Sequence, residues 1–238
     1  MTHSLAHVTV LEEYASACRS AADNALEVLR KKPDSLICIA TGASPLGLYA
    51  ELARHAAELA QARILKLDEW GGLAMDDPAT CEVYIREKIM EPWELPQERL
   101  IGFQSDAPDP EAECARIRAQ IDHAGGIDLC ILGMGADGHI GLNYPAPTLP
   151  AEAHLTDAST LKHAMLDAAL GVPTHGFTLG MAEVLRSRCI VLIINGAFKA
   201  HAAQRLMTGD ITTEFPASFL WLHPNVHLFA DRAAVPAL

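Results

Sequence analysis

A short apolar run in the middle of the chain constrains the fold more than any other feature. The run Ile127–Leu132 is almost continuously apolar and does not alternate between apolar and polar residues. This composition is typical of a strand buried on both faces of a parallel sheet. Asp137 and His139 follow closely after its carboxyl end. Because ligands bind at the carboxyl edge of open α/β sheets, where the loops converge, we expect a functional site around these two residues.

The glycines after this run also match the dinucleotide-binding pattern G-x-G-x-x-G, at Gly133, Gly135 and Gly138. That pattern requires a helix that begins at the third glycine and directs its N-terminus at a pyrophosphate. Several prolines follow within the next dozen residues, and a proline inside a helix costs about 3 kcal/mol, which excludes a helix of useful length. We therefore interpret the glycines as a turn that lets the backbone approach a small ligand closely and that presents Asp137 and His139.

The charge balance argues against two broad functional classes. The 238 residues include 18 basic and 30 acidic side chains, for a net charge of -12. Such a chain repels phosphate backbones and acidic lipid head groups, so we expect neither a nucleic-acid partner nor a membrane partner. A small phosphorylated ligand in a locally basic pocket is compatible with this balance.

Cysteine usage and the first residues indicate a cytoplasmic protein. The six cysteines form no C-x-x-C pair, and we expect them to be reduced core residues. No segment approaches the roughly 18 unbroken apolar residues of a membrane span. The first residues also lack the basic segment followed by an apolar segment that is typical of a signal peptide.

Strand-like and helix-like segments alternate along the chain, with connections too short for independent lobes. Strands are predicted at 35–40, 63–67, 100–103, 127–132, 177–179, 189–194, 217–221 and 226–229. Helices are predicted at 11–32, from 45 onward, and at 78–90, 110–123, 160–170 and 197–207. We therefore predict a single domain over residues 1–238. Its fold would be α/β, a three-layer α/β/α sandwich with a mostly parallel, Rossmann-like sheet that binds no dinucleotide.

Two further strand ends carry residues suited to a site. After strand 35–40, Ser44 can cap the next helix and Pro45 fits its first position, so free N–H groups would point back at the loop. The small loop residues leave room for an anion, although an ordinary strand-to-helix turn has the same composition. Asp68 lies at the end of strand 63–67. Its carboxylate can act there as a general acid or base, or it can simply cap the start of the loop.

Lys199 lies in the first turn of the predicted helix 197–207. A cation there opposes the helix dipole, so the side chain either faces an anion or is simply solvated. No pair of histidines and carboxylates has zinc-ligand spacing, and we expect no metal. Without a G-x-S-x-G elbow, a Ser-His-Asp hydrolase is unsupported.

Four separated segments together resemble one family. They are the loop that begins at Thr41, the strand end Leu67–Trp70, the run Gly133–Asn143 and the helix of Lys199. Their order and spacing resemble the glucosamine-6-phosphate deaminase (isomerase) family over nearly the whole chain. The sequence Asp-Glu-Trp and the segment 217–223 look most like the galactosamine-6-phosphate type. The 6-phosphogluconolactonases share the Asp-Gly-His core but typically continue with Thr-Ala-Ser, where this chain has Ile-Gly-Leu-Asn.

The resemblance implies a role for each candidate residue. His139, oriented by Asp137, would open the pyranose ring by moving a proton between O1 and O5. Asp68 would carry a proton between C2 and C1, and ammonia would leave once C2 is an imine. The sugar phosphate would be bound by Lys199 and by the loop residues Thr41, Gly42, Ala43 and Ser44. The scheme requires no cofactor.

One residue departs from the family pattern. Tyr144 stands where the family usually has a glutamate after the asparagine. A phenol is neutral at working pH and supplies only a hydrogen bond, so His139 should depend on Asp137 alone.

The function expected from these residues is conversion of galactosamine- or glucosamine-6-phosphate to the ketohexose 6-phosphate and ammonia. A 6-phosphogluconolactonase and a non-catalytic sugar-phosphate-binding regulator are the alternatives. The only partner that the sequence indicates is a small sugar phosphate. The oligomeric state stays open, and a homo-oligomer is compatible with the sequence.

Overall fold

A seven-stranded sheet, all of whose neighbouring strands run parallel, forms the centre of the computed structural model, which describes residues 7–235. Its strand order is β1-β10-β9-β6-β2-β3-β5. The strands are β1 (His7–Leu11), β2 (Leu36–Ile39), β3 (Arg63–Lys66), β5 (Leu100–Ile101), β6 (Leu129–Gly133), β9 (Cys189–Ile194) and β10 (Val226–Asp231). The predicted parallel sheet is confirmed.

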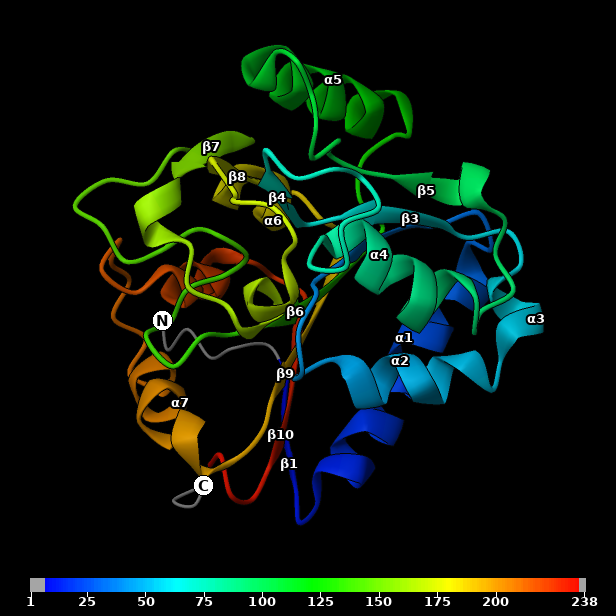
Figure 1. Ribbon diagram of the computed structural model, residues 1–238. Coiled ribbons are helices and arrows are strands. Elements are labelled where there is room, and N and C mark those ends of the chain that lie inside the picture. Colours follow the sequence, from blue (N-terminus) through cyan, green and yellow to red (C-terminus); the bar gives the residue numbers. More distant parts are fainter. Residues whose placement is uncertain (1–6, 236–238) are drawn as a thin grey trace.

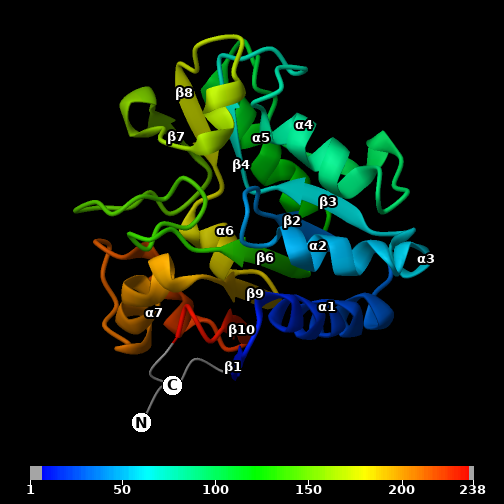
Figure 2. The same ribbon diagram turned by 60° about the horizontal axis from the view of Figure 1, so that its bottom comes forward.

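Helices cover both faces of this sheet, which confirms the three-layer sandwich (Figures 1 and 2). One face packs against α1 (Tyr14–Lys31), α2 (Leu46–Ala53), α3 (Ala56–Leu59) and α4 (Cys81–Ile85). The other packs against α5 (Pro110–His123), α6 (Met181–Leu185) and α7 (Ala200–Met207). Along β2, Ile37 and Ile39 join the first core, whereas Leu36 and Cys38 join the second. Burial on both faces explains why these strands read as continuous apolar runs.

A second, antiparallel sheet was not predicted. It consists of β4 (Asp68–Gly71), β8 (His175–Thr178) and β7 (His154–Asp157) in the order β4-β8-β7, at the upper left of Figure 1. Leu67 joins the two sheets, because its N–H bonds to Ile39 in the parallel sheet and its carbonyl accepts from Leu179. The chain therefore leaves the parallel sheet at one residue, and Asp68 lies at the junction.

Two element predictions were wrong in type. The predicted strand 217–221 is a 3₁₀ helix, Pro216–Leu222, because Pro216 begins the helix and the N–H of Ala217 bonds to Gly138 instead of to a strand. The predicted helix 160–170 is two short 3₁₀ turns, Ala158–Thr160 and Ala164–Ala168. The residue before each turn, Asp157 or His163, accepts a backbone N–H with its side chain, and such local bonds favour separate turns over one helix.

The starts of two helices also differ from the predictions. The first residue of the predicted helix 11–32 belongs to β1, and α1 begins at Tyr14. The predicted helix 78–90 begins at Cys81, because Thr80 is the N-cap and its side chain accepts from Val83. From Arg86 the helix widens to a π-helix that ends at Met90. None of the helices within residues 7–235 is long and apolar enough to cross a membrane.

Candidate active site

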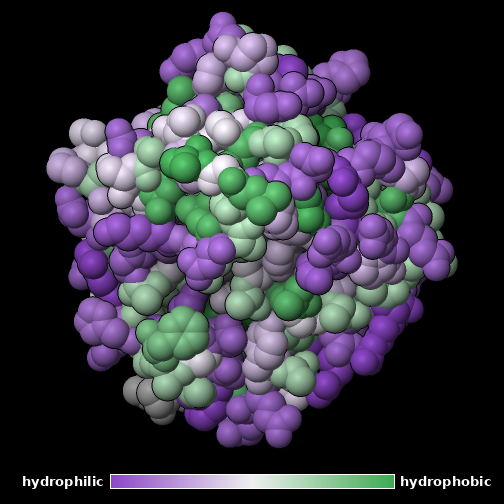
Figure 3. Space-filling model, in the orientation of Figure 1, coloured by the Kyte–Doolittle hydropathy of each residue, from purple (hydrophilic) through white to green (hydrophobic). Residues whose placement is uncertain are grey.

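A pocket of about 280 Å³ lies at the carboxyl edge of the parallel sheet. Its walls come from the segments that follow β2, β6 and β9, and from β4. This is the edge at which a parallel sheet brings together residues distant in sequence. Figure 3 shows the side of the molecule that is turned to the viewer in Figure 1. Hydrophobic residues gather in the upper middle of this side, with hydrophilic residues around them.

Nearly all of the predicted site residues line this pocket. They are Thr41, Gly42, Ala43, Ser44, Asp68, His139, Tyr144 and Lys199. Asp137 is not part of the lining but is bonded to His139. His163 and Phe198 also line the pocket, although neither was predicted as a site residue. No motif contains His163, while Phe198 could have been suspected only as the neighbour of Lys199.

Two tyrosines hold the loop between β2 and α2 in place. The Tyr14 hydroxyl donates to the carbonyl of Ser44 (2.9 Å) and accepts the N–H of Gly47 (2.9 Å). The Tyr84 hydroxyl donates to the carbonyl of Gly42 (2.7 Å). Gly42 has φ of 106°, a conformation that strongly favours glycine. These bonds hold the carbonyls of Gly42 and Ser44. The loop Thr41–Ser44 therefore keeps its shape along the pocket wall, and we call it the cradle.

The start of α2 differs from the prediction. Pro45 is the N-cap, with helical φ of -87° and ψ of -3°, and α2 begins at Leu46. Ser44 therefore does not cap the helix. Its hydroxyl instead lies 3.5 Å from the Nζ atom of Lys199. The serine therefore joins the loop to Lys199, which also lines the pocket.

Lys199 is a buried cation at the Ser44 end of the cradle. It follows β9 in a 3₁₀ turn directly before α7, as the sequence predicted, and it is only 8% exposed. Its Nζ atom also donates to the carbonyl of Met134. Burial lowers the pKa of Lys199, while the carboxylate of Asp137 opposes that shift. No carboxylate forms an ion pair with this lysine among the described residues, so its charge is free to face an anionic ligand.

Asp68 is a buried carboxyl group that lines the pocket from β4. Burial, followed by the negative charge of Glu69, raises the pKa of Asp68 to about 7. The Cys81 thiol lies 3.9 Å from Oδ1 of Asp68 and 3.4 Å from the hydroxyl of Thr41. The thiol thus connects the carboxyl group with the cradle. A carboxyl group with this pKa can both take and give a proton near neutral pH.

Behind Asp68 lies a buried ion cluster, which we call the Lys66 triad: Lys66, Glu69 and Glu82. The ammonium group of Lys66 lies 2.8 Å from Glu69 and 2.9 Å from Glu82, and Lys66 is completely buried. Burial alone lowers the pKa of this lysine, but the two carboxylates reverse the shift and raise it.

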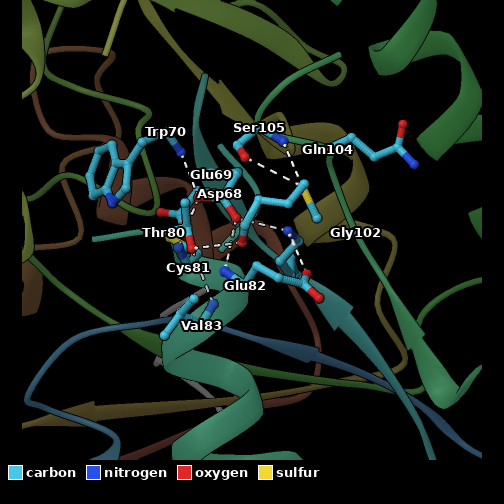
Figure 4. A network of polar contacts seen from close by, with 12 residues as sticks. Asp68, Glu69, Trp70, Thr80, Cys81, Glu82, Val83, Gly102, Gln104 and Ser105 are labelled. Carbon is cyan, nitrogen blue, oxygen red and sulfur yellow. Dashed lines mark hydrogen bonds and ion pairs between the residues drawn. The ribbon is translucent and has the colours of Figure 1, made fainter. Parts of the chain in front are cut away.

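The Glu69 carboxylate also accepts the backbone N–H groups of Trp70, Cys81 and Glu82 (Figure 4). These bonds attach β4 to the first turn of α4. Because successive strand residues point to opposite faces, the cluster fixes β4 from behind while Asp68 faces the pocket.

His139, which lines the pocket, is hydrogen-bonded to Asp137. Nδ1 of His139 lies 2.7 Å from Oδ1 of Asp137, and this bond lowers the pKa of Asp137 to about 2 despite partial burial. Because Nδ1 is occupied, Nε2 is the ring atom free to exchange a proton. A Cβ atom on Gly135 would lie 2.2 Å from Nδ1 of His139. This glycine therefore makes room for the histidine as well as lining the pocket.

Tyr144 touches His139 through its ring, with centroids 5.0 Å apart. Burial, followed by the carboxylates of Asp68 and Asp137, raises the pKa of Tyr144 to about 12. The phenol is therefore neutral, as predicted from its ordinary pKa.

The residues around the glycines contain no nucleotide-binding helix, since the chain from 134 to 153 forms only turns, bends and one isolated bridge. Within residues 7–235, no cluster of three or more His, Cys, Asp or Glu side chains is arranged to hold a metal ion.

Taken together, the fold and the pocket define an α/β protein that places a loop of small residues, a buried lysine, a buried carboxyl group and a histidine at the carboxyl edge of its sheet. The chain belongs to the family described as glucosamine-6-phosphate isomerases/6-phosphogluconolactonase, whose model matches residues 11–228.

Curated relatives match nearly the full length of the chain. A protein of Escherichia coli (strain K12) named "Putative deaminase AgaI" is 38% identical over 94% of this chain and 91% of its own length. Glucosamine-6-phosphate deaminase of Lysinibacillus sphaericus (strain C3-41) is also 38% identical, over 90% of this chain and 93% of its own length.

Solved structures share the fold. A monomeric glucosamine-6-phosphate deaminase superposes with a TM-score of 0.87 at 31% identity, covering 96% of this chain and 98% of that one. A 6-phosphogluconolactonase from Trypanosoma brucei has a TM-score of 0.73 at 18% identity, over 96% and 97% of the two chains. At that identity the likeness extends to the fold alone.

Proposed function

We propose that this protein is an amino-sugar-phosphate deaminase/isomerase. Its substrate is a 2-amino-2-deoxyhexose 6-phosphate, and its products are the ketohexose 6-phosphate and ammonia. The observation that carries this proposal is that Asp68 and His139 face one pocket whose other wall is the cradle with Lys199. A phosphate bound there would hold the sugar against both acid–base groups.

The first step is ring opening. His139 takes the proton of the O1 hydroxyl on Nε2 and returns it to O5, so the C1–O5 bond breaks and an aldehyde forms at C1. Asp137 holds Nδ1–H, which leaves the lone pair of Nε2 directed away from the carboxylate. The same bond stabilises the imidazolium that forms during transfer.

The second step is proton transfer between carbons. The carboxylate of Asp68 takes the proton from C2 while O1 takes a proton from water, which gives an enolamine with a hydroxyl on C1. Asp68 then returns its proton to C1. The nitrogen lone pair forms an imine at C2, water adds to it, and ammonia leaves to give the ketone. Because the pKa of Asp68 is about 7, the group is basic enough to act and still releases the proton afterwards.

Lys199 and the residues Thr41, Gly42, Ala43 and Ser44 bind the phosphate. Backbone N–H groups at the start of α2 and the buried ammonium supply the positive potential that a dianion needs. These contacts are the same in the ground state and in the transition state. They therefore contribute to binding and orientation more than to the chemical step.

The experiment is detection of ammonia and ketose phosphate from galactosamine-6-phosphate and from glucosamine-6-phosphate. We expect release from at least one epimer, and the galactosamine compound is the first candidate because of the Asp-Glu-Trp segment. If the protein releases acid from 6-phosphogluconolactone and no ammonia from either amino sugar, it is a 6-phosphogluconolactonase and not a deaminase. Ligand binding without any turnover would indicate the regulator.

We also infer that the protein acts in the cytoplasm. All six cysteines are free and buried, as expected for a reducing compartment. Sugar phosphates are charged, and membranes retain them where they form.

A further inference from the structure

His163 belongs to no motif, yet its ring is held in one orientation. It precedes the 3₁₀ turn Ala164–Ala168, and its Nδ1 atom accepts the N–H of Met165 at 3.2 Å. An imidazole nitrogen that accepts a backbone N–H carries no proton, so the proton of the neutral ring is on Nε2. Burial and the nearby His139 lower the pKa of His163, which keeps the ring neutral near pH 7.

The ring of His163 lies directly over the cradle. A Cβ atom built on Gly42 would be 3.6 Å from Nε2 of His163. On another side, the ring faces the indole of Trp70, with centroids 5.7 Å apart and planes inclined by 36°. All three residues line the pocket.

Only one polar atom of this ring is left for a ligand. Among the described residues, Nε2 of His163 has no hydrogen-bond partner, and it is not sealed off in the core. Lys199 lies at the Ser44 end of the loop, while Nε2 of His163 lies at the Gly42 end. A phosphate between these two ends would meet the ammonium group on one side and this N–H group on the other.

We propose that His163 is a ligand of the substrate phosphate, which it binds by donating Nε2–H across the cradle from Lys199. This inference rests on the proposed function for the identity of the substrate, but its geometry does not depend on turnover. Trp70 and Met165 fix the ring, so little side-chain entropy is lost when the phosphate binds.

Two substitutions of His163 distinguish the loss of the Nε2–H donor from a loss of folding. His163→Phe keeps a ring against Trp70 but removes the donor. His163→Asn keeps a side-chain acceptor for the Met165 N–H but cannot reach the cradle. His154→Phe is the control, since His154 lies on β7 of the same small sheet and does not line the pocket. Thermal unfolding of each variant shows whether it is folded before binding is measured.

The probes are inorganic phosphate and a hexitol 6-phosphate, which has no carbonyl group and cannot be deaminated. Calorimetry should show that both His163 variants bind each probe roughly tenfold or more weakly than the wild type, as expected for a lost bond to a charged group. His154→Phe should bind as the wild type does. With the amino-sugar substrate, KM should rise by a similar factor while kcat changes little.

Unchanged phosphate affinity in folded His163→Phe and His163→Asn would overturn the inference. A loss for the hexitol phosphate without a loss for inorganic phosphate would also overturn it, because His163 would then contact the sugar. Ammonia release by the wild type is measured in parallel. If the wild type binds both probes but releases no ammonia, the proposed function fails while the binding data still decide the role of His163.

Discussion

One carboxylate oxygen of Asp137 holds His139 at two points. Oδ1 lies 2.7 Å from Nδ1 of the ring and accepts the backbone N–H of the same histidine at 3.2 Å. The ring orientation and the loop conformation therefore depend on the same atom. Because Asp137 is half exposed, this pair contributes more to orientation than to stability.

Asp137→Asn should lower kcat by roughly 10- to 100-fold and leave KM nearly unchanged. The amide can still accept one hydrogen bond, but it no longer stabilises the imidazolium formed during ring opening. Steady-state kinetics with the amino-sugar phosphate test this expectation. Asp157→Asn is a matched control: Asp157 also accepts a backbone N–H two residues later, but its partner Ser159 does not line the pocket, whereas His139 does. Equal kinetics for the two variants would remove Asp137 from the mechanism.

Asp68→Asn should lower kcat by roughly 10²-fold or more while the affinity for a hexitol 6-phosphate persists, because a general base is lost and no phosphate contact changes. In the wild type, kcat/KM should rise with pH through about 7, where Asp68 ionises. A flat profile between pH 5.5 and 8.5, or near-normal turnover of the variant, would contradict the role of Asp68 as the base.

The raised pKa of Asp68 also makes a prediction about stability. In the unfolded chain the carboxyl group ionises near its ordinary pKa, whereas in the native state it holds its proton up to about pH 7. The stabilisation from the protonated group is thus fully present below about pH 4 and is lost as the pH rises through about 7. Asp68→Asn, which is always neutral, should therefore be more stable than the wild type at pH 8, by on the order of 2–4 kcal/mol. Denaturant titrations at pH 8 and at pH 4 should show a difference that disappears at the lower pH. The opposite trend would show that Asp68 is stabilised as a carboxylate.

The sequence predicted the groups at the strand ends well, and there is a physical reason. In a parallel sheet, every carboxyl end lies at the same edge. The loop at Thr41, the turn at His139 and Lys199 could therefore be placed together from three apolar runs, although more than 150 residues separate the first from the last. Asp68 was placed correctly as well, although the strand that carries it was not predicted.

The supporting contacts could not be predicted in this way. Tyr14 and Tyr84 reach the cradle from two helices, and their hydroxyls bind backbone carbonyls, which leaves no sequence pattern. His163 is positioned by a turn that replaced a predicted helix. The Lys66 triad is hidden in the sequence because its members fall in a strand, in the Asp-Glu-Trp segment and in a helix. Each of these contacts depends on how the elements dock, and hydrophobic periodicity carries no information about docking.

Tyr84→Phe should raise KM several-fold and change kcat little, because the Gly42 carbonyl loses the hydroxyl that fixes the cradle at 2.7 Å. The stability cost should be about 1 kcal/mol, as for one lost hydrogen bond. Ser35→Ala is the matched control, since it also removes a hydroxyl bonded to a backbone carbonyl, but at the opposite edge of the sheet. If both variants have the wild-type KM, the tyrosine does not shape the phosphate site.

Lys66→Met should strongly destabilise the protein, because it leaves Glu69 and Glu82 buried without their common cation. The expected loss of unfolding free energy is about 3–5 kcal/mol, the usual cost of removing one partner of a buried ion pair. Lys88→Met is the comparison, since Lys88 pairs with Glu87 at 3.6 Å on the surface and its loss should change stability by less than about 0.5 kcal/mol. The triple variant Lys66→Met, Glu69→Gln and Glu82→Gln should recover much of the loss, because no unpaired buried charge remains. Urea unfolding of the three variants measures these differences. If Lys66→Met proves no less stable than Lys88→Met, the Lys66 triad does not hold β4 against α4, and the placement of Asp68 must have another cause.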